Sequence, residues 1–174
     1  DMAVEAAPGR WMAAARDFSK LVSIAAIRPE DRVLDIAAGT GYSTAVLVRL
    51  AASVVALEQD EAAAKTLREG LAAAGVAGVE VVSGPLKAGF PGKAPFDVIF
   101  VNGAVEEVPA AWLSQLAEGG RLVVAVAEGS VRRRPSTATN TSWPGGGGAP
   151  AATPLGSCCL HQRLHTILIA WPNN

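Results

Sequence analysis

The sequence has few aromatic residues, few cysteines and no long apolar run. Aromatic side chains make up 5% of the 174 residues, so Ala, Val and Leu must fill most of the core. Two cysteines cannot form a disulfide-rich scaffold. No run approaches the ~18 apolar residues of a membrane-spanning helix, so we expect no membrane association. The formal charge of −1 lacks the basic excess of nucleic-acid-binding domains, so we expect no nucleic-acid partner.

What the chain does contain is unevenly distributed. Hydrophobic residues make up 50% of it, which is enough for one globular domain. All 16 acidic and eleven of the 15 basic residues precede position 129, which gives that part a net charge of −5. The rest has no Asp, Glu or Lys. We therefore predict a core over residues 1–128 and an atypical Gly/Pro/Ser/Thr-rich tail over residues 129–174, with one candidate strand at 164–171.

The tail carries two features that could suggest a ligand. Cys158, Cys159 and His161 contain metal-binding atoms, but zinc ligands are rarely adjacent in sequence, so we predict no metal site. The three arginines at 132–134 are typical of a solvated segment. We expect residues 130–159 to be flexible. No signal peptide precedes Asp1, which predicts a cytoplasmic location.

Apolar runs alternate with helical patterns through the core. Expected strands are residues 33–36, 54–57, 79–82, 96–101 and 122–126. Expected helices are residues 11–27, 43–50 with Val46, Leu47 and Leu50 facing inward, 61–74 capped by Asp60, and 109–116. This alternation predicts an α/β fold, a mostly parallel sheet with helices on both faces. In such sheets a ligand binds beyond the carboxyl ends of the strands, near the switch in strand order.

The first expected strand contains Asp35 and leads into a glycine-containing turn, Gly39-Thr40-Gly41, which begins four residues after Asp35. Glycines let the backbone approach a ligand closely, and the following helix points its first amides at the same place. Glu58 ends the next strand, 23 positions after Asp35, where such folds hold ribose hydroxyls. Taken singly, each feature has a structural alternative. The glycines are also typical of a tight strand-to-helix turn, and an acid such as Glu58 is also typical of a solvated strand end.

The spacing of the glycines bears on the kind of nucleotide. A dinucleotide motif reads G-x-G-x-x-G, but here Thr44 occupies the third glycine position. That glycine allows close packing under a pyrophosphate. Its absence favours a ligand without pyrophosphate, such as S-adenosylmethionine.

The run from Val33 to Ser43 resembles the first motif of class I S-adenosylmethionine-dependent methyltransferases. Residues 54–60, 81–86, 96–101, 105–109 and 116–123 also resemble segments of protein-L-isoaspartate O-methyltransferases, in particular their divergent bacterial branch. The resemblance covers residues 10–128 and implies a Rossmann-like class I methyltransferase fold, here truncated at the N-terminus and with an atypical C-terminal tail.

By this resemblance, S-adenosylmethionine would be bound by residues at three strand ends. Asp35, Gly39 and Gly41 would line its methionine end, with Ala37 in the same loop. Glu58 would take the ribose hydroxyls. The adenine would lie beside Gly84, Pro85 and Leu86, and Asn102 and Gly103 would lie near the cofactor.

The chain also departs from the family pattern. Ala37 stands where the family usually has a glycine, an exchange that is tolerable if φ is negative. Pro85 replaces a frequent aspartate, and residues 11–15 replace a Ser-Gln-Pro-like segment that places a serine near the reacting carboxylate. A reading-frame shift near Gly129 is a hypothesis for the unusual tail, which sequencing the gene would test.

The leading hypothesis is methyl transfer to the carboxylate of isoaspartyl residues in damaged proteins or peptides, a protein-repair reaction. A carboxylate is already ionised at neutral pH, so no general base is required and the sequence nominates no catalytic residue. The alternatives are a catalytically degenerate cofactor-binding domain and a nucleotide-dependent oxidoreductase. The oligomeric state is left open.

Overall fold

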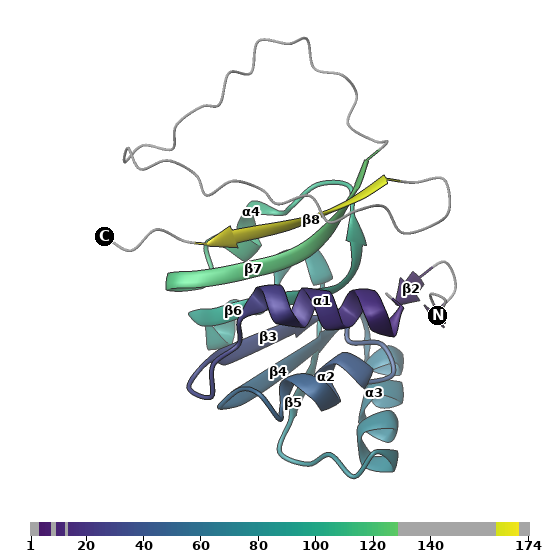
Figure 1. Cartoon of the computed structure of the whole chain (residues 1–174). Coiled ribbons are helices and arrows are strands. Elements are labelled where there is room, and N and C mark those ends of the chain that lie inside the picture. Colours follow the sequence, from purple (N-terminus) through teal and green to yellow (C-terminus); the bar gives the residue numbers. More distant parts are fainter. Residues whose placement is uncertain (1–3, 8–9, 13, 129–162, 171–174) are drawn as a thin grey trace, which may run out of the picture.

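The computed structural model describes residues 4–7, 10–12, 14–128 and 163–170 (Figure 1). Six strands form one sheet, whose order in space is Glu80–Ser83 (β5), Ser53–Glu58 (β4), Arg32–Ile36 (β3), Phe96–Val105 (β6), Leu116–Glu128 (β7) and Arg163–Ala170 (β8). A separate two-stranded antiparallel sheet pairs Val4–Ala7 (β1) with Arg10–Met12 (β2).

The strands from β5 to β7 are parallel, and β8 pairs antiparallel with β7. The chain leaves β3 toward β4 and β5 and then returns to β6 on the other side of β3. The order of the strands therefore switches between β3 and β6, and their carboxyl ends mark the place where a ligand is expected. The predicted α/β fold with a mostly parallel sheet is confirmed.

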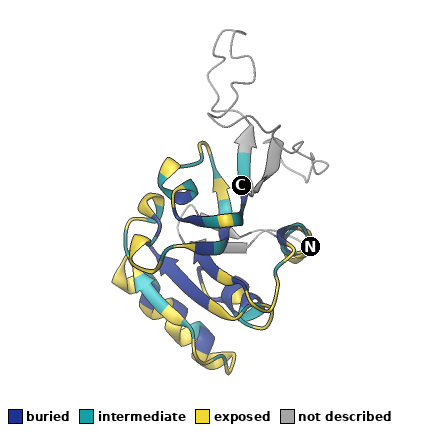
Figure 2. Ribbon diagram, turned by 90° about the vertical axis from the view of Figure 1, so that its left-hand side faces the viewer, coloured by how far each residue is buried: buried dark blue, intermediate teal, exposed yellow. Residues whose placement is uncertain are grey.

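Helices cover both faces of the sheet because its strands alternate apolar side chains between the two faces. In Figure 1, Ala15–Ala25 (α1), Tyr42–Leu47 (α2) and Glu61–Ala73 (α3) lie in front of the strands and Ala110–Leu113 (α4) lies behind them. The α1 and α2 side is filled by a cluster that includes Phe18, Val54 and Phe100. The opposite face is filled by residues that include Leu34, Ile99 and Trp112. Figure 2 shows the strands as the buried layer between exposed helix surfaces.

Several expected element boundaries were wrong. The first helix starts at Ala15 rather than at residue 11, since residues 10–12 pair with β1. The second helix ends at Leu47, and Leu50, which we expected to face inward, is 38% exposed. The helix after Pro109 ends at Leu113 instead of continuing to 116. Propensity alone does not set these ends, because strand pairing and packing decide them.

Two strands are longer than expected because each continues through a bulge. The sixth strand runs on to Val105, with a shift of register against β7 between Phe100 and Ala104. The seventh, which we expected from residue 122, begins at Leu116, so Gly119 and Gly120 lie inside it. A Cβ on Gly120 would lie 2.8 Å from the carbonyl oxygen of Ala117, so this bulge needs a glycine.

The strand expected at 164–171 overlaps β8 at Arg163–Ala170. The division of the chain into a core and a tail at residue 128 stays a prediction. The tail groups at 132–134 and 158–161 and the flexible segment expected at 130–159 lie outside the described residues. Within the described part of the chain, no helix is long and apolar enough to cross a membrane.

A buried ion pair fastens the end of α1 to the sheet. The Arg121 guanidinium on β7 pairs with the Asp31 carboxylate, and the two side chains are only 13% and 5% exposed. Arg121 also donates from Nε to the carbonyl of Ala25 at 2.8 Å, and Asp31 accepts from the amide of Arg28 at 2.8 Å. The pair therefore satisfies the carbonyl end of α1 and closes the loop into β3.

Replacing Arg121 by Met should leave the buried Asp31 carboxylate without its cationic partner. Breaking one side of a buried pair costs about 3–5 kcal/mol, so the free energy of unfolding in urea should fall by a similar amount. The matched control is Lys20→Met, which removes an exposed partner of Asp17 and should change stability by less than about 0.5 kcal/mol. Equal, small effects of the two variants would contradict this reading of the pair.

Candidate functional site

The candidate site is built around the Asp35 carboxylate at the end of β3. This side chain is fully buried. Its Oδ2 accepts hydrogen bonds from the hydroxyls of Ser43 at 2.8 Å and Thr44 at 2.6 Å, both on the first turn of α2. Its Oδ1 has no hydrogen-bond partner among the described residues. A buried, unsatisfied carboxylate oxygen is costly, so Asp35 can accept from a donor that the described residues do not supply.

The environment of Asp35 favours its protonated form. Burial raises the pKa of Asp35, hydrogen bonds from Thr44 and Ser43 lower it, and the negative charge of Glu58 raises it again. The net effect moves the pKa from 3.8 to about 7. Asp35 therefore changes charge near neutral pH, and a cation placed beside it would favour the carboxylate.

Glu58, at the end of β4, fastens the motif loop to the neighbouring strand. It is also fully buried. Its Oε1 accepts from the amide of Gly39 at 2.6 Å and its Oε2 from the amide of Gln59 at 3.1 Å. Glu58 thus closes the loop at the end of β4, with each of its carboxylate oxygens accepting from a backbone amide.

The loop itself needs positive φ angles at several positions. Gly39 and Gly41 have φ values of 64° and 96°. Ala37 has φ of 63°, so the condition under which alanine would be tolerable there, a negative φ, is not met. An alanine with left-handed φ and ψ costs about 1–2 kcal/mol. Glycine, the residue that the resemblance implies at position 37, adopts the same angles at a lower cost because it has no Cβ. Ala37 is therefore a strained departure inside the loop.

Helix α3 packs closely against the same loop. A Cβ on Gly70 would lie 2.0 Å from the carbonyl oxygen of Thr40, and a Cβ on Gly41 would lie 3.0–3.1 Å from the side chains of Leu67 and Leu71. Glycine is required on both sides of this contact. Gly70 was not singled out from the sequence, because a glycine inside a helix looks like a simple propensity defect until its neighbour is known.

Asn102 joins the network from the bulge in β6. Its side-chain amide donates to the Ser43 hydroxyl at 3.2 Å, and the residue is 8% exposed. Ser43 in turn donates to Asp35, so the ends of β3 and β6 are linked through the start of α2. Gly103 follows in the same bulge with open space at its Cβ position. Bulges of this kind commonly redirect side chains beside functional sites.

The loop after β5 reaches the site through Gly84. The Gly84 amide donates to the carbonyl of Glu58 at 2.8 Å, which places Pro85 and Leu86 next along the edge of the site. Leu86–Ala88 forms a 3₁₀ turn (η1), and Pro91–Lys93 forms a second (η2). The structure thus gathers all ten sequence-predicted residues along the carboxyl ends of β3, β4, β5 and β6. Their assignment to a cofactor stays a prediction.

Sequence reasoning missed Ser43 and Thr44 as site residues. Thr44 served only as evidence that the third glycine of a dinucleotide motif is missing. In the structure the hydroxyls of Ser43 and Thr44 both donate to Asp35. Their position just after a glycine turn, at a helix start, was a usable signal.

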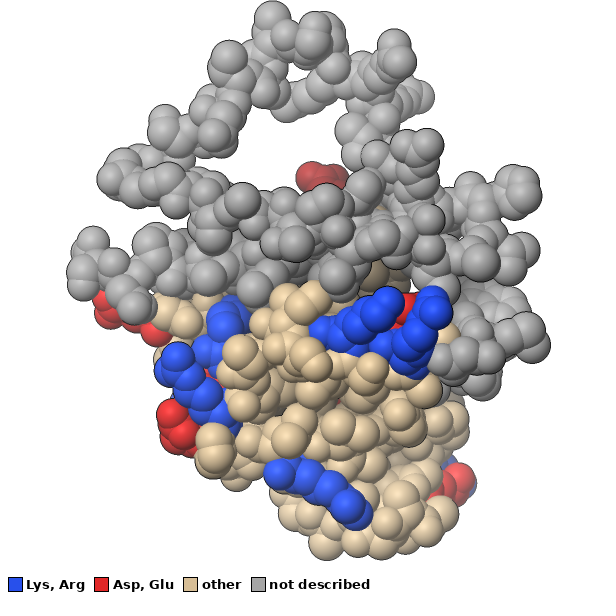
Figure 3. Space-filling model, in the orientation of Figure 1, with Lys and Arg blue, Asp and Glu red and all other residues tan. Residues whose placement is uncertain are grey.

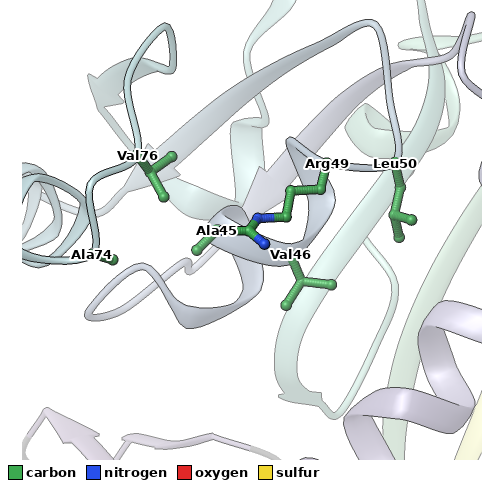
Figure 4. A pocket seen from close by; sticks show the side chains of 6 residues that line it. All are labelled: Ala45, Val46, Arg49, Leu50, Ala74 and Val76. Atoms are coloured by element: carbon green, nitrogen blue, oxygen red, sulfur yellow. The ribbon is translucent and has the colours of Figure 1, made fainter.

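The hollow in Figure 4 lies elsewhere. It has a volume of about 330 Å³ and is lined by Ala45, Val46, Arg49, Leu50, Ala74 and Val76. Ala45 and Val46 belong to α2, and the other four residues lie in the segments that follow α2 and α3 and lead back to the amino ends of the strands. The site chemistry lies at the other edge of the sheet, so this hollow is not part of the candidate site.

Solved structures with a similar fold include methyltransferases. A protein-L-isoaspartate O-methyltransferase matches with 29% identity and a TM-score of 0.61 over 72% of this chain and 41% of that chain. A dimethyladenosine transferase from Plasmodium falciparum matches with 21% identity and a TM-score of 0.56 over 67% of this chain and 43% of that chain, which shows the fold alone. The domain therefore has the class I methyltransferase fold, with its acidic residues and glycine turn at the switch in strand order.

The family model for protein-L-isoaspartate(D-aspartate) O-methyltransferase matches residues 5–139, and the chain belongs to this family. The protein-L-isoaspartate O-methyltransferase of Methanoculleus marisnigri is 49% identical over 100 residues, which are 58% of this chain and 46% of that protein. The one from Methanoregula boonei is 51% identical over 98 residues, which are 56% of this chain and 45% of that protein. The chain thus spans about half the length of the curated relatives it matches.

The strain at Ala37 predicts a stabilising substitution. Ala37→Gly should raise the free energy of unfolding by about 0.5–1 kcal/mol, because glycine adopts the left-handed conformation without a Cβ clash. Ala38→Gly is the matched control in the same loop: Ala38 is fully buried and does not have a positive φ, so glycine there should lower stability. Chemical denaturation of the three proteins measures both effects, and a loss of stability in Ala37→Gly would contradict the argument.

The raised pKa of Asp35 predicts a pH dependence of stability. Between about pH 4 and pH 7 the native protein holds a proton on Asp35 that the unfolded chain has lost, so stability decreases as the pH rises through this range. Asp35→Asn removes this proton linkage. The difference in unfolding free energy between the wild type and Asp35→Asn should therefore change across this window and level off above it. Parallel curves from pH 4 to pH 8 would show that the Asp35 pKa is not raised.

Proposed function

We propose that this chain binds S-adenosylmethionine at the carboxyl ends of β3, β4 and β6 and transfers its methyl group to the carboxylate of isoaspartyl residues in damaged proteins or peptides. The observation that best supports binding of S-adenosylmethionine is the buried Asp35, whose Oδ1 has no partner among the described residues, beside a second buried carboxylate, Glu58. Membership of the family supports the isoaspartyl acceptor. A cytoplasmic location stays a prediction.

The charge of the site fits this cofactor. S-adenosylmethionine has a net positive charge, because its ammonium and sulfonium groups outnumber its single carboxylate, and two buried carboxylates favour cations. A dinucleotide would bring an anionic pyrophosphate to the same carboxylates, which is unfavourable. In the proposed complex, the Oδ1 of Asp35 accepts from the ammonium group and Glu58 accepts from the ribose hydroxyls. Asn102 keeps Ser43 oriented toward Asp35 by its hydrogen bond.

The residues of the chain would act mainly by positioning. The cofactor, when bound, supplies a methyl group activated by the sulfonium. An isoaspartyl carboxylate has an ordinary pKa near ~4 and is ionised at neutral pH, so no side chain needs to remove a proton. Holding the attacking oxygen and the methyl group in line can contribute up to ~7–11 kcal/mol in ideal cases. The rigid loop held by Glu58 and by Gly70 would serve that purpose on the cofactor side.

The surface is compatible with a protein or peptide acceptor. Figure 3 shows Lys and Arg in separate groups on the face that carries α1 and α2, divided by uncharged surface. On this visible face of the described residues they form no continuous basic track of the kind that follows a phosphate backbone.

The test is a titration of the purified chain with S-adenosylhomocysteine by calorimetry. Wild type should show saturable binding, and Glu58→Gln should weaken it by about tenfold or more, because one hydrogen-bonded charge is worth about 1.5–3 kcal/mol. Glu69→Gln, an exposed carboxylate on α3, is the matched control and should bind like wild type.

A second step separates binding from catalysis. With S-adenosylmethionine in excess, an isoaspartyl peptide should be methylated and the same peptide with normal aspartate should not. Binding without transfer would support the degenerate-domain alternative. No binding by a folded chain, or preferential binding of NAD, would overturn the cofactor assignment.

A further inference from the structure

Two buried side chains near α4 hold the turn that follows Gly84 and Pro85. The indole Nε1 of Trp112 donates to the carbonyl of Leu86 at 2.9 Å. The Gln115 side chain bridges two further points of the same segment: its Nε2 donates to the carbonyl of Ala88 at 2.7 Å, and its Oε1 accepts from the amide of Phe90 at 2.8 Å. Residues 86–90 are therefore fastened by three side-chain hydrogen bonds from residues more than twenty positions away.

This attachment is tight and shielded from water. Trp112 is 2% exposed and Gln115 is 5% exposed. Gly89 has a φ of 64°, and a Cβ there would lie 2.6 Å from Oε1 of Gln115. The buried amide of Gln115 loses both partners if the turn moves, and leaving such groups unsatisfied is costly. The position of the turn is thus set by α4 and the residues after it.

The hydrogen bonds of this turn among the described residues use neither of its first two backbone donors, the N–H groups of Leu86 and Lys87. The carbonyl of Leu86 accepts from both Trp112 and the amide of Gly89, and the carbonyl of Pro85 accepts from the amide of Ala88 at 2.9 Å. Among the described residues, no hydrogen bond uses the amide N–H of Leu86. This N–H belongs to the same peptide unit as the Pro85 carbonyl, so its direction is fixed by the bonds around it.

We propose that Trp112 and Gln115 are positioning residues that hold the Leu86 amide against the base of the cofactor and so determine the preference for adenine. The inference rests on the proposed function, since it needs a cofactor beside Gly84, Pro85 and Leu86. Adenine presents an accepting ring nitrogen, N1, to a fixed N–H donor. N1 of hypoxanthine carries a hydrogen, so it cannot accept from that N–H. The difference in affinity between the two bases is therefore largest when the N–H is held firmly in place.

The experiment compares the affinity of the full chain for S-adenosylhomocysteine and for S-inosylhomocysteine by calorimetry. Wild type should prefer the adenine compound by about tenfold, the value of one hydrogen bond. In Trp112→Phe, which keeps an aromatic ring but lacks the donor, the preference should fall toward unity. Gly89→Ala is the second variant, because its Cβ displaces Gln115 from the opposite side of the turn, and the preference should fall there too.

The ratio of the two affinities separates positioning from general damage. A variant that is merely less stable weakens both ligands alike and leaves the ratio unchanged, which would overturn the inference. Ser114→Ala is the matched control directly after α4, since the exposed Ser114 hydroxyl bonds only back to the carbonyl of Ala111, and its ratio should equal that of wild type. An undiminished preference in both Trp112→Phe and Gly89→Ala, or no preference in a wild type that does bind, also overturns it. If the wild type binds neither compound, the proposed function fails and the inference fails with it.

Discussion

The structure depends on burying two carboxylates, Asp35 and Glu58, at the ends of adjacent parallel strands. Burying charged groups is expensive unless hydrogen bonds compensate. The glycine turn and the start of α2 provide that compensation, because the Gly39 amide binds Glu58 and two hydroxyls bind Asp35. These hydrogen bonds therefore set the shape of the turn after β3, and they leave Oδ1 of Asp35 without a partner among the described residues.

The same site is supported from both faces of the sheet. On the face covered by α3, Gly70 lets the helix reach the Thr40 carbonyl, so the turn cannot move in that direction. On the opposite face, Trp112 and Gln115 hold the turn after Gly84. In β6 a bulge turns Asn102 toward Ser43 and connects the third strand end. Rigid support on several sides suits a reaction in which the protein contributes position rather than proton transfer.

The sequence predicted most of this framework and some of the site. Short apolar runs located β3, β4 and β5 to within one residue at each end, because buried parallel strands are apolar on both faces. Asp60 was correctly expected to cap α3, as its side chain accepts from the amide of Ala63. The helix expected over residues 11–27 is present as α1, but its expected start was wrong, because Trp11 and Met12 pair with β1. Gly119 and Gly120 lie outside the strand expected at 122–126, although pairing with β6 places them within a bulged strand.

The amino-acid sequence by itself determined the alternation of strands and helices, the glycine turn, and the two acids at strand ends, because periodicity and residue chemistry are local properties of the chain. Only the tertiary structure decided the positive φ of Ala37, the need for glycine at position 70, and the joining of Leu86 to Trp112. Each of these follows from a contact between segments that are distant in sequence or from a backbone angle that those contacts impose. Such constraints exist only once the strands are placed in order and the helices are packed on them.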